Sequence, residues 1–223
     1  MFDSLAKAFH NGGIGMYPIA LALAFGLAIV IERFYVLFVV SSVDKETFLR
    51  GLKKHIYAGD LDKAISYCAG QKRTPLVSVI KAGLINVPKG EEDVQAAMDE
   101  ATLRESPKIE KRTGYLAMIS NVATLLGLLG TIIGLIHCFG AVAFANPADK
   151  ANILSQGISE AMYCTAFGLS VAIPTLILYS VLQGRTQSMV DDINESSVSV
   201  LNLIVANRDK MKMPASLGEE AAG

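Results

Sequence analysis

Three long apolar runs divide the chain, and a polar segment with helical patterning separates the first two. The runs extend from Ile14 to Val40, from Leu116 to Ala145 and from Ile153 to Leu182. The second contains no Lys, Arg, Asp or Glu, and the third contains only Glu160. Each is longer than the ~20 apolar residues with which an α-helix crosses the hydrocarbon core of a bilayer. The pattern therefore predicts three transmembrane helices.

The polar segment carries the signals of helix ends. Asp60 is placed as an N-cap, Pro75 suits a first helical turn, and the acids at Glu91–Asp93 suit a helix N-terminus. We expect Pro107 to kink or interrupt its helix before the chain continues into the second apolar run. Strand alternation is absent from the sequence. The predicted fold class is all-α: a membrane protein with three transmembrane helices, of which the long second and third extend into a cytoplasmic helical domain.

Composition supports this class and excludes others. Of the 223 residues, 52% are hydrophobic and 18% charged, and the net charge of -1 comes with no basic cluster that would bind nucleic acid. The three cysteines fit reduced packing residues rather than disulfides or metal ligands. No hydrolase, metalloprotease or phosphate-loop motif is present. We therefore expect neither an enzyme nor a bound metal or cofactor.

The distribution of basic residues predicts the orientation. The segment from Ser41 to Gly114 contains thirteen Lys and Arg, the first thirteen residues and the last loop contain one each, and the tail after Leu182 contains four. The positive-inside rule then places the N-terminus in the periplasm and the C-terminus in the cytoplasm. The expected organisation is a periplasmic segment (1–13), a first transmembrane helix (14–40), a cytoplasmic helical segment (41–114), a second transmembrane helix (115–145), a short periplasmic loop (146–152), a third transmembrane helix (153–183), and a cytoplasmic C-terminal helix with a disordered tail (184–223).

Polar residues of the second and third runs fall into two layers. With a rise of ~1.5 Å per residue, His137 and Glu160 both lie roughly 11 Å from the outer ends of their helices. Thr131 and Thr165 both lie near the middle of the bilayer. A charged residue at a helix centre costs roughly 2.5–3.5 kcal/mol, so Glu160 indicates a water-accessible or proton-conducting site more than a neutral packing residue.

Structural alternatives exist for the other polar positions. Each threonine hydroxyl could bond back to its own helix, and His137 alone favours polar packing over a proton relay. Pro174 predicts either a hinge or a static bend. Small residues on one side of each helix predict close helix packing. The glycines concerned are Gly127, Gly130, Gly134 and Gly168.

Two stretches, "LLGLLGTIIGLIHCF" and "GISEAMYCTAFGLSVAIP", resemble the paired signature of the MotA/TolQ/ExbB proton-channel family. The family's Gly-Thr matches Gly130-Thr131, its Glu-Ala-x-x-Ala-Thr matches Glu160 to Thr165, and its Ala-Ile-Pro ends at Pro174. The similarity is closer to the three-span TolQ/ExbB branch than to four-span MotA. The chain departs from the family pattern at Met162, Tyr163 and Cys164, which puts the polarity of the pore in question.

The resemblance implies an ion-channel motor subunit of the bacterial inner membrane. Such proteins form a homopentamer around a dimer of a single-span ExbD/TolR-like partner that carries a membrane aspartate. Protons or possibly Na⁺ would then pass Thr131 and Thr165, with Glu160 toward the periplasmic mouth, His137 and Tyr163 as pore or relay residues, and Pro174 as a hinge. The passing ions would drive mechanical work on the cell envelope.

Two other functions are compatible with three spans. A non-conducting membrane scaffold would use the same small-residue packing without an ion path. A secondary transporter would show inverted repeats and broken helices, and the three unequal spans have no such symmetry. Nutrient uptake, Tol-type envelope constriction and gliding motility all fit the motor hypothesis, because the periplasmic domain of the partner would decide between them.

Overall fold

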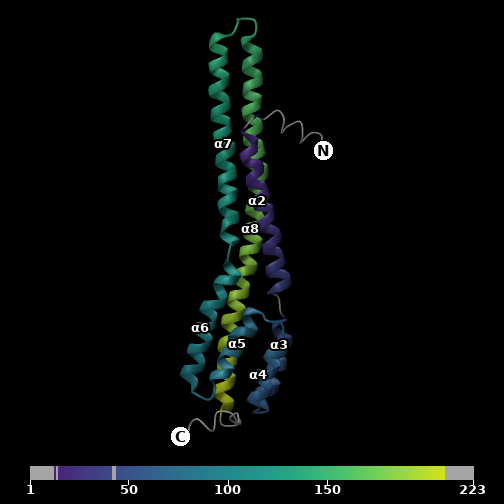
Figure 1. Ribbon diagram of the computed structural model, residues 1–223, viewed down its shortest axis with the longest axis vertical. Coiled ribbons are helices and arrows are strands. Elements are labelled where there is room, and N and C mark those ends of the chain that lie inside the picture. Colours follow the sequence, from purple (N-terminus) through teal and green to yellow (C-terminus); the bar gives the residue numbers. More distant parts are fainter. Residues whose placement is uncertain (1–12, 14, 42–43, 209–223) are drawn as a thin grey trace. The chain divides into compact units, whose positions relative to one another are not determined.

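The computed structural model describes residues 13, 15–41 and 44–208, and it places most of them in helices (Figure 1). The helices are α2 (Met16–Tyr35), the π-helical turn η1 (Val36–Val40), α3 (Lys45–Tyr57), α4 (Leu61–Gly70), α5 (Pro75–Asn86), α6 (Glu91–Glu110), α7 (Thr113–Phe144) and α8 (Lys150–Asn207). No strand occurs in these ranges, which confirms the all-α class. The predicted N-terminal segment and disordered tail fall at 1–12 and 209–223, outside the described residues.

Three helical stretches of the described chain are long and apolar enough to cross a membrane, as predicted. Their apolar parts are α2, α7 and the first half of α8. Helix α8 continues without a break for 58 residues, well past the apolar run that begins it. The third candidate span thus passes directly into a polar helix.

The helix that contains Pro107 ends later than the sequence indicates. Pro107 lies inside α6, and the amide of Lys111 still donates to the Pro107 carbonyl at 2.9 Å. The interruption falls at Lys111 and Arg112, and Arg112 has the left-handed φ of 66°. Proline removes only its own N–H, so the turn that follows it stays bonded. The second candidate span therefore begins afresh at Thr113 instead of continuing from the proline-containing helix.

The chain divides into two compact units. The first unit contains the described residues up to Arg33 together with 112–183, which comprise most of α2, all of α7 and the first half of α8. The second unit contains 34–111 and the described residues from Gly184 onward.

Small and apolar side chains form the core of the first unit. Ile19 of α2, Ala123 of α7, and Val171 and Ala172 of α8 are almost inaccessible. In the same core, the Ser120 hydroxyl donates to the carbonyl of Ala172 at 2.8 Å and joins α7 to α8. Large apolar side chains point outward instead, which suits contact with lipid or with other protein chains. Examples are Leu125, Ile136 and Phe139, each more than half exposed.

The helix ends of the second unit follow the signals in the sequence. The Asp60 carboxylate accepts the amide of Lys63 at 3.1 Å and caps α4. Helix α5 begins at Pro75 behind a Thr74 cap, and α6 begins with the acids from Glu91. The predicted cap, first-turn proline and acidic N-terminus are all confirmed. Local hydrogen bonding thus determines where these helices begin.

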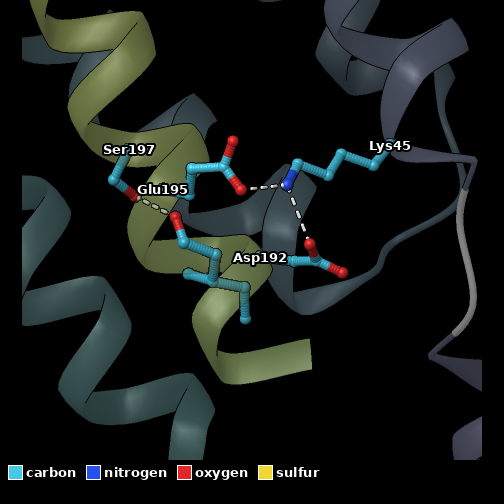
Figure 2. Close-up of polar contacts among 5 residues, drawn as sticks. Lys45, Asp192, Glu195 and Ser197 are labelled. Carbon is cyan, nitrogen blue, oxygen red and sulfur yellow. Dashed lines mark hydrogen bonds and ion pairs between the residues drawn. The ribbon is translucent and has the colours of Figure 1, made fainter. Parts of the chain in front are cut away.

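An ion-pair cluster joins α3 to the polar half of α8 (Figure 2). The Lys45 ammonium donates to Asp192 at 2.8 Å and to Glu195 at 2.6 Å. The two carboxylates raise the pKa of Lys45, so it stays protonated at neutral pH. On the same helix, Ser197 donates to the carbonyl of Ile193 at 2.8 Å. A pair of acids one turn apart therefore fixes the start of α3 against α8.

Candidate functional site

Glycines let α7 and α8 approach to backbone contact. A Cβ built on Gly168 would lie 2.8 Å from the carbonyl oxygen of Ala123 and 3.0 Å from the Cα of Gly127. On Gly130 it would lie 3.0 Å from Cys164, and on Gly134 it would lie 3.2 Å from the Cβ of Ala161. All four predicted packing glycines thus lie at the contact between these helices. A methyl group at Gly168 would meet backbone atoms, which have little room to move.

Thr131 and Thr165 meet at this contact. Their hydroxyl oxygens are in direct hydrogen-bond contact, and both side chains are half-buried. Thr131 can also donate to the carbonyl of Gly127 at 2.9 Å, and Thr165 reaches the same carbonyl at 3.3 Å. The close glycine contact gives both hydroxyls access to one backbone oxygen. The structure therefore pairs the two threonines that helix counting places at one level.

The bond from Thr131 to Gly127 runs within α7, as the structural alternative predicts for a threonine in a helix. The bond from Thr165 to the same carbonyl crosses from α8 to α7. Back-bonding and cross-helix contact therefore coexist in this pair. A hydroxyl has one hydrogen to donate and two lone pairs, so the pair can exchange which partner donates.

Glu160 and His137 line one cavity of about 760 Å³ in the first unit. Both side chains are exposed, and no hydrogen bond or ion pair joins them within the described residues. Gln156 adds a third polar side chain to the wall, and the thiols of Cys138 and Cys164 add two weak ones. Glu160 and His137 therefore face an open, mostly apolar cavity with a few polar side chains in its wall, and they are not in direct contact.

The backbone before α2 covers part of this cavity. Gly13 has a left-handed φ of 66°, and a Cβ added to it would overlap the Glu160 carboxylate. A Cβ on Gly15 would lie 3.0 Å from the Cys164 sulfur. The backbone just before α2 thus approaches both Glu160 and Cys164 closely.

The remaining predicted site residues lie apart from the threonine pair. Tyr163 is 37% exposed and does not line the cavity, in contrast to its neighbour Cys164. Pro174 is exposed within continuous α8, and Thr175 beside it donates to the carbonyl of Val171 at 2.8 Å. The structure therefore brings together Thr131 with Thr165 and Glu160 with His137, and it leaves Tyr163 and Pro174 outside both groups.

Sequence reasoning missed three contributors to this region. Ser120 makes a buried bond across the helices, and Gln156 lines the cavity. Each is an uncharged polar residue in or beside an apolar run, which is the signal that could have identified it. Gly13 has no comparable signal, because its role depends on a positive φ and on the nearness of Glu160.

The first unit also contains an ion pair, between Glu32 and Arg112, that the sequence does not predict. Arg112 donates to the Glu32 carboxylate at 2.5 Å, and Arg33 lies 3.9 Å from the same carboxylate. Arg33 is only 3% exposed. Glu32 thereby ties α2 to the residue that precedes α7.

Comparisons with known proteins agree on one family. Residues 71–195 match the MotA/TolQ/ExbB proton channel family. A putative biopolymer transport protein ExbB homolog of Methanothermobacter thermautotrophicus is 30% identical over 193 residues, covering 86% of this chain and 67% of that protein. The biopolymer transport protein ExbB of Salmonella typhimurium is 28% identical over 211 residues, covering 85% and 84%. The Tol-Pal system protein TolQ of Haemophilus influenzae is 36% identical over 96 residues, covering 43% and 42%.

Proposed function

The chain belongs to the MotA/TolQ/ExbB proton channel family, and from this premise we propose that it is the channel subunit of an ion-driven motor in a bacterial inner membrane. The motor couples the transmembrane ion gradient to mechanical work on the cell envelope. Relatives named for biopolymer transport and for the Tol-Pal system support an envelope machine of this kind.

The contact between Thr131 and Thr165 carries the proposal. It places two hydroxyls from adjacent helices together in an otherwise apolar and small-residue contact. Hydroxyl groups can both donate and accept, so they can replace part of the hydration of a passing ion. A homopentamer would repeat the pair around an axis and form a polar belt at one depth. Close packing alone needs only the glycines.

Glu160 acts at the entrance to this belt. Its carboxylate faces a cavity wide enough for water, and His137 and Gln156 supply further polar groups. A carboxylate in a hydrated hollow attracts cations and can exchange protons with water. The cavity therefore serves as the vestibule from which ions reach the threonines. With the orientation that the basic residues predict, this vestibule opens toward the periplasm.

The motor also requires a partner. The apolar runs of this chain contain no aspartate, so the central ion-carrying carboxylate must come from elsewhere. A dimer of a single-span ExbD/TolR-like protein with a membrane aspartate would supply it inside the homopentamer. Protons are the expected ions, Na⁺ is the alternative, and no bound cofactor is needed.

Separate collapse of the proton and sodium gradients tests the function. Envelope work by the native host should stop with a proton ionophore and continue with a sodium ionophore. Arrest by the sodium ionophore alone would assign Na⁺ as the driving ion. Glu160→Gln, Thr131→Ala and Thr165→Ala should each reduce this work at normal protein levels. Full activity of all three variants would favour the non-conducting scaffold.

A further inference from the structure

The second unit contains a cavity of about 400 Å³ that is lined by cations without a carboxylate. Lys81 and Ser78 line it from α5, Arg104 from α6, and Cys68 from α4. Arg73 joins them from the connection between α4 and α5. Three positive side chains from three different segments thus converge on one hollow.

The positive charge of this cavity is not neutralised by the surrounding protein. Arg73 and Lys81 make no ion pair with any described residue. Arg104 reaches Glu105 only at 4.0 Å, and Glu105 has a closer partner in Lys108 at 2.7 Å. Like charges gathered in one hollow repel each other, so an anion between them would lower the energy of the unit.

The uncharged part of the wall does not oppose an anion. Burial raises the pKa of the Cys68 thiol to about 11, although the nearby Lys81 charge works against this, so the thiol stays neutral at physiological pH. Ser78 presents a hydroxyl, which now donates to the carbonyl of Thr74 at 3.0 Å. The apolar side chains of Val77 and Ile85 complete the wall. The cavity therefore combines positive charge with an apolar surface that suits the organic part of an anionic ligand.

We propose that this cavity is a binding site for an anion of the phosphate class. Arginine and lysine bind phosphate by charge-assisted hydrogen bonds, and arginine can present two donors to one group. The volume exceeds that of a single phosphate and falls within the range of ~300–1,000 Å³ that is typical of small-ligand pockets. The site lies in the second unit and is independent of the ion path. Its ligand could be free pyrophosphate, a nucleotide or the headgroup of an anionic lipid.

The positive-inside rule offers a simpler explanation for basic residues in this unit. Under that explanation only the number of cations matters, and each can remain solvated wherever it lies. A binding site instead requires the particular cations that line the cavity. Lys54 is a matched control because it is exposed on α3, lies outside this cavity and makes no side-chain hydrogen bond or ion pair with a described residue.

Calorimetric titration tests the site in the full-length chain. The protein is placed in phosphatidylcholine nanodiscs at low ionic strength and titrated with pyrophosphate and, separately, with ADP. We expect saturable binding of at least one probe. Lys81→Gln should weaken it about tenfold, the effect of losing one charged hydrogen bond, and Arg104→Gln should weaken it similarly. Lys54→Gln should leave the affinity unchanged.

The pattern of binding identifies the source of the anion. Tighter binding of ADP than of pyrophosphate assigns an organic phosphate, and the reverse assigns a free inorganic anion. Loss of both in nanodiscs that contain phosphatidylglycerol assigns a lipid headgroup that occupies the site. Absence of saturable binding of either probe in phosphatidylcholine overturns the proposal. An equal loss of affinity in Lys54→Gln overturns it as well, because the attraction would then be a general effect of surface charge.

Discussion

The Gly127 carbonyl is the point at which the two central threonines meet. It already accepts a bond within α7, yet a carbonyl oxygen has a second lone pair, which Thr165 approaches from α8. This arrangement favours glycine at position 127, because a Cβ there would lie only 3.2 Å from the carbonyl oxygen of Cys164. The polar pair and the small-residue contact are therefore one feature of the molecule.

Removing the Thr165 hydroxyl should impair ion-driven work. We expect Thr165→Ala to lower activity at least about tenfold, which corresponds to roughly 1.4 kcal/mol, while Thr165→Ser keeps most of it by restoring the hydroxyl. Ser170→Ala is the matched control, since Ser170 is exposed on the same helix and its hydroxyl, among the described residues, bonds only back to the carbonyl of Ala166. Gradient-dependent envelope function at equal expression is the measurement. Equal activity of Thr165→Ala and the control would remove Thr165 from the ion path.

A methyl group at Gly168 should separate α7 from α8. Because the obstructing atoms belong to the backbone of Ala123 and Gly127, we expect Gly168→Ala to cost about 1–3 kcal/mol, as overpacking does elsewhere. Gly140→Ala adds the same methyl group where no neighbouring side chain or other segment lies within 4 Å, and it should not destabilise the protein. Thermal loss of helical signal in detergent compares the two variants. A Gly168→Ala protein as stable as Gly140→Ala would contradict the close contact.

The relative depth of two residues on neighbouring helices was predictable, because it depends only on the number of residues between each of them and the end of its helix. A fixed rise per residue places Thr131 and Thr165 at one level, and the contact between them confirms that geometry. The same count places Glu160 near His137, but it does not reveal that a cavity separates them. Nor does it place Tyr163 outside the cavity, because rotation about the helix axis depends on the packing of neighbouring helices.

At the scale of elements, helix starts were more predictable than helix ends. Asp60 and Pro75 act on atoms within three residues of themselves. The helix starts that they produce can therefore be recognised from the local sequence. The break at Lys111 and Arg112 has no such local cause. The ion pair between Arg112 and Glu32 joins residues 80 positions apart, so no local pattern in the sequence indicates that contact.

The Asp60 cap should make the free energy of unfolding depend on pH in the acidic range. The Lys63 ammonium and backbone amide hold the pKa of Asp60 below its usual value, so the ionised form stabilises the folded state. This contribution is complete above the unfolded pKa of about 3.9 and is lost as the pH falls through the lower folded value. Asp60→Asn keeps a capping oxygen but removes the titrating charge.

Urea unfolding of both proteins, followed by circular dichroism because the chain has no tryptophan, measures this dependence. The stability difference between wild type and Asp60→Asn should be constant from neutral pH to about pH 4 and should shrink below it. A difference that stays constant below about pH 4 as well would show that the charge of Asp60 contributes nothing to the cap.

At the scale of the whole molecule, α8 takes part in two kinds of packing. Its first half contacts α7 through glycine and threonine, and its second half bonds to α3 through Asp192 and Glu195. The small-residue contact suits an apolar surrounding, and the ion pairs suit water. One continuous helix therefore contains both a candidate membrane span and a polar segment.

Assembly is the prediction that belongs to this scale. The exposed apolar faces of α7 and α2 require lipid or other chains, and a homopentamer would cover part of them. Native mass spectrometry of the purified chain should give a pentamer, and co-expression with the single-span partner should add two copies of that protein. Monomers alone, under conditions that keep the chain helical, would contradict the motor.

The sequence by itself determined the all-α class, the number of candidate spans, several helix starts and the levels of the polar residues. These properties depend on the length of apolar runs, on local hydrogen bonding and on the fixed rise of a helix. Each of them can be worked out from residues that are close together in the sequence. Only the tertiary structure decided that Thr131 and Thr165 share the Gly127 carbonyl, that Gly13 lies against Glu160, and that Lys81 and its neighbours form a cationic cavity. Those contacts depend on how helices rotate and approach each other, which packing between distant segments controls.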